Sequence, residues 1–114
     1  MQFHANYIST SISGDYCQAA FAAEKDSGDS ANPYLLLQPQ FEMPDGVECY
    51  IETHDKNYIG HFLLRCVEFT PKKLFIEVDR PMDNLINVIF DMTIAEFKRA
   101  SRVVRIIRRL RCAR

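Results

Sequence analysis

Several features that mark large functional classes are missing from this sequence of 114 residues. It contains no apolar run of about 18 residues, the length that a membrane-spanning helix needs. Its first four residues, Met1 to His4, form neither a basic nor an apolar segment, so no secretory signal peptide is visible. We therefore expect a cytoplasmic protein with no transmembrane segment.

Catalytic signatures are also missing. Only four glycines occur, and no glycine-rich phosphate loop or nucleophile elbow is present. The four cysteines include no C-x-x-C pair, which argues against a zinc knuckle or a redox motif. Cys17, Cys49 and Cys66 fall in expected strands, where we interpret them as small buried apolar residues rather than disulfide partners. We expect no cofactor, no bound metal and no enzymatic activity.

Acidic residues are absent from the last 17 positions. Residues 98–114 hold 8 of the 14 bases and no acid, whereas residues 1–97 hold all 15 acids and 6 bases. The formal net charge of −1 therefore hides an acidic body with a charge of −9 and a basic end with a charge of +8. Such an asymmetry points to a charged interaction surface.

Alternation of apolar and polar residues predicts seven short strands between residues 2 and 91. We place them at residues 2–9, 16–23, 34–38, 47–53, 61–69, 74–78 and 85–91. Residues 34–38 form an apolar run that is typical of a buried strand. Short turns between the strands favour antiparallel pairing.

The period changes at residues 93–111, which predict an amphipathic helix. Its apolar residues recur three or four positions apart: Ile94, Phe97, Ala100, Val104, Ile107 and Leu110. Thr93 and Glu96 have the spacing of a capping box at its start. Packed on one face of the sheet, this helix gives a single α+β domain over residues 1–114.

The clearest strand carries an acidic face. Glu48, Tyr50 and Glu52 alternate with apolar residues, and Asp55 and Tyr58 follow in the next turn. A solvated strand face is the simpler interpretation. The alternative is a protein-binding surface, in which tyrosine is a favoured anchor.

Two histidines flank the same turn. His54, Asp55 and His61 are side-chain types that bind zinc or exchange protons, which leaves a small hydrolase as a minor alternative. A solvated turn with ordinary histidines is again the simpler interpretation.

The helix has a basic face. Lys98, Arg102, Arg105 and Arg109 follow the spacing that puts residues on one side of a helix. These residues suit nucleic acid, an acidic partner or an anionic membrane. They could equally pair with the acidic body of the same chain.

A set of strand and turn motifs resembles a known family. The motifs are Tyr34-Leu35-Leu36-Leu37-Gln38, Tyr50-Ile51-Glu52, Asp55-Lys56-Asn57-Tyr58-Ile59-Gly60, Val67-Glu68-Phe69 and Leu74-Phe75-Ile76-Glu77-Val78. They resemble the immunity protein 10 family of bacterial polymorphic toxin systems. The resemblance implies a small α+β domain that binds and neutralises a cognate toxin protein. Nucleic-acid binding through the helix is the alternative function, and the sequence leaves the oligomeric state open.

Overall fold

The computed structural model describes residues 1–13, 16–24, 32–39 and 48–110. These residues form eight strands, a short 3-10 helix and one α-helix. The strands are β1 (Gln2–His4), β2 (Tyr7–Ser13), β3 (Tyr16–Ala22), β4 (Tyr34–Pro39), β5 (Glu48–Thr53), β6 (Gly60–Phe69), β7 (Lys73–Val78) and β8 (Leu85–Ile89). The helices are η1 (Lys56–Tyr58) and α1 (Ile94–Leu110). The predicted α+β class is confirmed, with eight strands rather than seven.

The extra strand arises because the expected strand at residues 2–9 is two strands. The chain breaks at Ala5 and Asn6, whose backbone N–H groups donate to different partners, the carbonyls of Ile89 (2.8 Å) and Ala22 (2.9 Å). On one side of the break β1 pairs in parallel with β8, and on the other β2 pairs antiparallel with β3. The sheet order is therefore β1-β8-β7-β6-β5-β4-β3-β2. One short link joins the two ends of this order.

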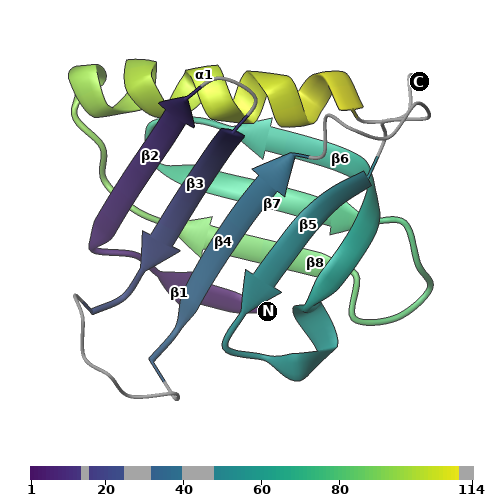
Figure 1. Cartoon of the computed structure of the whole chain (residues 1–114). Coiled ribbons are helices and arrows are strands. Elements are labelled where there is room, and N and C mark those ends of the chain that lie inside the picture. The colour runs from purple at the N-terminus through teal and green to yellow at the C-terminus, as the bar shows by residue number, and fades with distance from the viewer. Residues whose placement is uncertain (14–15, 25–31, 40–47, 111–114) are drawn as a thin grey trace.

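The sheet bends into two layers (Figure 1). Strands β2 to β5 lie in front, and β6, β7, β8 and β1 lie behind them and cross their direction. In β6 the pairing register with β7 shifts between Leu64 and Cys66. Such an irregularity bends a strand, and here it lies in the strand that links the two layers.

The core lies between these layers. Inward side chains from both halves form one apolar cluster, including Phe21 and Leu35 from the front and Ile76 and Val88 from the rear. The ring of Phe21 stacks on Phe90, with 5.6 Å between the ring centroids. Cys17, Cys49 and Cys66 are buried free thiols, as expected, and burial raises the pKa of Cys49 to about 12.

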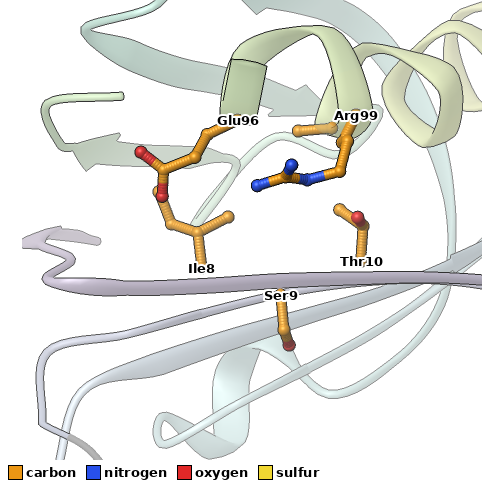
Figure 2. Close-up of a pocket in the computed structure, with 6 residues that line it drawn as sticks. Ile8, Ser9, Thr10, Glu96 and Arg99 are labelled. Carbon is orange, nitrogen blue, oxygen red and sulfur yellow. The ribbon is translucent and has the colours of Figure 1, made fainter. Parts of the chain in front are cut away.

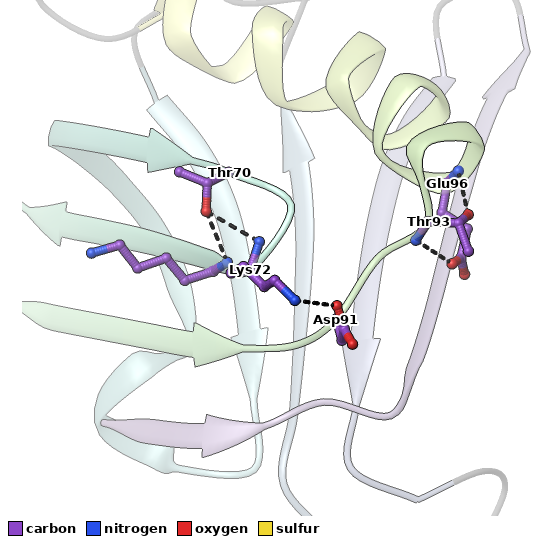
Figure 3. A network of polar contacts seen from close by, with 6 residues as sticks. Thr70, Lys72, Asp91, Thr93 and Glu96 are labelled. Atoms are coloured by element: carbon purple, nitrogen blue, oxygen red, sulfur yellow. Dashed lines mark hydrogen bonds and ion pairs between the residues drawn. The ribbon is translucent and has the colours of Figure 1, made fainter.

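Helix α1 packs against β2 to β6 at one end of the two layers (Figure 1). Its capping box is confirmed (Figure 3): the N–H of Thr93 donates to Glu96 Oε1 at 3.0 Å, and the N–H of Glu96 donates to Thr93 Oγ1 at 3.2 Å. Among its described side chains, Ala100, Val103 and Val104 are buried. No helix in the described ranges combines the length and apolar character that a membrane crossing requires.

One residue of the expected apolar stripe is exposed. Ile94 has 75% of its surface accessible, whereas Val103, which lay outside the expected stripe, is fully buried. Each helical residue turns the chain by about 100°, so Ile94 lies roughly 120° around the helix from Ala100. The stripe is centred on residues 100, 103 and 104, and Ile94 falls outside it.

Candidate partner-binding surface

Strand β5 places Tyr50 and Glu52 on the outer face of the front layer. Cys49, Ile51 and Thr53 point inward and are buried, so the residues between them point outward. Glu48 begins the same strand, but its side chain lies outside the described part of the structure. The sequence therefore placed two of its five candidate contact residues together on one face.

A residue from the neighbouring strand completes a cluster around Glu52. The hydroxyl of Tyr34, on β4, donates to Glu52 Oε2 at 2.9 Å. The hydroxyl of Tyr50 donates to the other carboxylate oxygen, Oε1, at 3.0 Å. Each oxygen of this carboxylate is thereby held by a tyrosine. We call Tyr34, Tyr50 and Glu52 the tyrosine–glutamate cluster.

The cluster keeps both tyrosines protonated well above neutral pH. Burial, followed by the hydrogen bond to Glu52, raises the pKa of Tyr34 to about 12. For Tyr50 the hydrogen bond to Glu52 is the main cause, and it also raises the pKa. A phenol that donates to a carboxylate resists losing its proton, because ionisation would put two negative charges side by side.

Histidines border the cluster. His61 on β6 stands opposite Tyr50 in the strand register, and their ring centroids are 5.3 Å apart. The N–H of Tyr34 donates to Nδ1 of His54 at 3.2 Å. His61 is exposed, whereas His54 is half-buried. The outer face therefore presents aromatic rings around one carboxylate.

The structure assigns Tyr34 an outward position that the sequence analysis missed. Residues 34–38 were interpreted as a buried strand, but only Leu35 and Leu37 are fully buried. Tyr34, Leu36 and Gln38 alternate with them and are half-buried on the outer face. The signal was available in the period of two, because any strand with Leu35 and Leu37 inside must turn Tyr34 outward.

Asp55 and Tyr58 do not join this face. Asp55 caps η1, its Oδ1 accepting the N–H of Asn57 at 3.0 Å. Tyr58 is only 5% exposed and belongs to the core cluster. The guanidinium of Arg80 lies over its ring, 5.2 Å from the centroid. The turn folds Tyr58 inward, so this tyrosine is not available as a surface anchor.

The histidines of the minor hydrolase alternative are engaged elsewhere. His54 bonds the backbone of Tyr34, and His61 packs on Tyr50. In the described ranges, no group of three or more His, Cys, Asp or Glu side chains is placed to hold a metal ion.

The basic face of α1 is unpaired where its side chains are described. Lys98, Arg102 and Arg105 are exposed; the side chain of Arg109 lies outside the described part. The ion pairs among the described residues link Arg65 to Asp79 and Glu77, and Lys72 to Asp91 at 2.7 Å (Figure 3). None involves a helix base. Within this part of the chain, pairing between the helix and the acidic body is not observed.

No family model, curated protein or solved structure matches the chain. The fold defines a small α+β domain with two surfaces of different chemistry. One is the tyrosine–glutamate cluster on the front layer, and the other is the unpaired basic face of α1. Functional conclusions rest on these two surfaces and on the sequence motifs.

Proposed function

We propose that this chain is an immunity protein, a stoichiometric inhibitor that binds a cognate toxin domain through the outer face of its front layer. The observation that carries the proposal is the tyrosine–glutamate cluster. Two tyrosine hydroxyls on neighbouring strands hold both oxygens of one carboxylate. The motifs shared with the immunity protein 10 family include all three residues of this cluster.

The cluster is suited to bind a cationic side chain. An ionised carboxylate has about four acceptor sites, and the two tyrosines occupy one on each oxygen. A guanidinium or ammonium group of a partner can use the others, and its charge strengthens the bond. Because the carboxylate is already oriented, little side-chain entropy is lost on binding. Tyrosine rings beside it supply the contact area typical of interface anchors.

The charge of the body favours a basic partner. Residues 1–97 carry a net charge of −9. A negative surface speeds the encounter with a positive partner and disfavours acidic ones. A toxin domain with a basic surface, such as a nuclease, has this chemistry.

The first experiment identifies the partner. The tagged chain is used as bait in nuclease-treated extract of the organism that encodes it, and retained proteins are identified by mass spectrometry. The retained domain is then expressed with and without the chain. We expect a one-to-one complex and restored growth of cells that carry the toxin domain. Growth arrest that persists despite complex formation would contradict an immunity function.

A matched pair of variants then tests the surface. Glu52→Gln removes one negative charge from the cluster, and Asp91→Asn removes one from an exposed position in the link between β8 and α1. We expect Glu52→Gln combined with Tyr50→Ala to weaken toxin binding by at least about 30-fold, the size of an interface hot spot. Asp91→Asn should leave binding within about twofold. Equal affinities for both variants would remove the cluster from the interface.

A second candidate function is nucleic-acid binding through α1, favoured by the unpaired side chains of Lys98, Arg102 and Arg105. Such binding would weaken steeply with salt, because each phosphate contact releases counterions. Titration of labelled duplex DNA and RNA at several salt concentrations measures that slope. Replacing Arg102 and Arg105 by glutamine should reduce it by about two ion contacts. A wild-type affinity in the double variant would exclude this function.

A further inference from the structure

Strand β2 is an end strand of the sheet and is unguarded. It pairs with β3 along one side, and its backbone makes no other hydrogen bond to the described residues. Natural edge strands are usually blunted by charged residues, proline or a bulge. The sequence of β2, Tyr-Ile-Ser-Thr-Ser-Ile-Ser, contains no charged residue and no proline. Its pairing with β3 runs from Tyr7 to Ser13 without a register shift.

A groove runs between this strand and α1. Two adjoining pockets of about 250 and 200 Å³ share Thr10 and Arg99 as lining residues. Ile8 and Thr10 point toward the helix, whereas Ser9 points away, and the guanidinium of Arg99 reaches over the strand (Figure 2). Ile12 and Arg102 line the second pocket. We call this feature the β2–α1 groove.

The charge of the groove is positive toward Ile12. Neither Arg99 nor Arg102 forms an ion pair with the described residues. Glu96, the acid that lines the first pocket, is engaged in the capping box through the N–H of Thr93. Ile12 is 49% exposed beside the two arginines. The groove thus offers an open strand edge, two guanidinium groups and an apolar contact.

We propose that the β2–α1 groove binds an extended acidic segment of a partner protein, which adds a strand to the edge of β2. The backbone of the segment would form the ladder, and its side chains on one face would alternate at the spacing of a strand. Carboxylates on that face pair with Arg99 and Arg102, and an apolar side chain covers Ile12. A second copy of β2 fits less well, because β2 has no acidic residue to pair with these arginines.

The groove lies apart from the tyrosine–glutamate cluster, which is built on β4 and β5. The proposal therefore does not depend on the immunity function, and either can fail alone. Arg99 and Arg102 are both exposed, so their replacement leaves the core intact.

Binding of a synthetic peptide tests the proposal. The probe is a fluorescent peptide of about ten residues in which glutamate and valine alternate, with a lysine–valine peptide as its counterpart. A third peptide has the glutamate–valine sequence but carries N-methyl groups on alternate backbone nitrogens, so it keeps its charge and cannot form a ladder. Fluorescence anisotropy measures the affinity of each peptide for the full-length chain.

We expect the glutamate–valine peptide to bind and the other two to bind at least about tenfold more weakly. Replacing Arg99 and Arg102 by glutamine should weaken binding at least about tenfold. The matched control replaces Lys98 and Arg105 by glutamine, which removes the same charge from the same helix outside the groove. Melting curves verify that both variants fold.

Three results would overturn the proposal. Equal losses in the two double variants would show that the helix attracts anions without using the groove. Equal affinity for the N-methylated peptide would exclude strand addition. Displacement of the peptide by a single-stranded oligonucleotide that binds more tightly would assign this face to nucleic acid instead.

Discussion

The proton affinity of Tyr34 offers a direct test of the tyrosine–glutamate cluster. Its pKa is raised from 10.0 to about 12, with burial as the largest cause and the hydrogen bond and charge of Glu52 following. Glu52→Gln removes the charge and leaves burial in place. We therefore expect the pKa of Tyr34 to fall in this variant but to stay above 10.0.

The raised pKa also makes stability depend on pH. A group that holds its proton more tightly when folded stabilises the protein at low pH and loses that contribution as its proton leaves. The contribution of Tyr34 is thus complete below about pH 10 and is lost as the pH rises to about 12. Each pKa unit corresponds to about 1.4 kcal/mol, which sets a ceiling of about 3 kcal/mol. Solvent screening at this half-buried site lowers the expected value to about 1–2 kcal/mol.

Two measurements examine this reasoning. Tyrosinate absorbance is followed against pH in the wild type and in Tyr34→Phe, and the difference isolates Tyr34 among the five tyrosines. Urea unfolding between pH 9 and pH 12 then compares the wild type with Glu52→Gln, so that the titration of lysines is common to both. Titration of Tyr34 near its ordinary value in both proteins would refute the cluster, as would equal losses of stability.

Three further outcomes concern the fold. Thr93→Ala removes the hydroxyl that caps α1 and should lower the free energy of unfolding by about 1 kcal/mol in urea titrations; no change would show that the helix start is held by other contacts. Leu35→Ala, at a fully buried position, should cost about 2–5 kcal/mol by the same method, and a loss below 1 kcal/mol would contradict its place in the core. In a Cys112→Ser variant, Cys17, Cys49 and Cys66 should react with a thiol reagent only after urea unfolds the chain, and rapid reaction of the native protein would contradict their burial.

Local patterns in the sequence predicted the elements whose determinants are local. The start of α1 depends on Thr93 and Glu96, which are neighbours in the chain, and both capping hydrogen bonds are present. Most strands were also placed correctly, because alternation follows from the geometry of a strand. Burial of three cysteines followed from the same alternation.

Features that depend on distant partners could not be predicted in this way. Residues 2–9 alternate as one strand would, but Ala5 and Asn6 donate to carbonyls in β8 and β3. Nothing near these two residues in the sequence indicates that division. The same holds for Tyr34, whose partner Glu52 is 18 positions away. Tyr58 lies inward because Arg80, on another turn, covers its ring.

The position of α1 decides how its basic residues can be studied. Truncation after Glu96 would remove Ala100, Val103 and Val104, all of which lie in the core. A truncated chain that fails to bind would therefore report unfolding rather than a lost contact. Single replacements on the exposed side avoid this difficulty. Because Arg99 faces the groove beside β2 while Arg105 does not line it, comparing these two positions separates strand addition from a general attraction of anions to the helix.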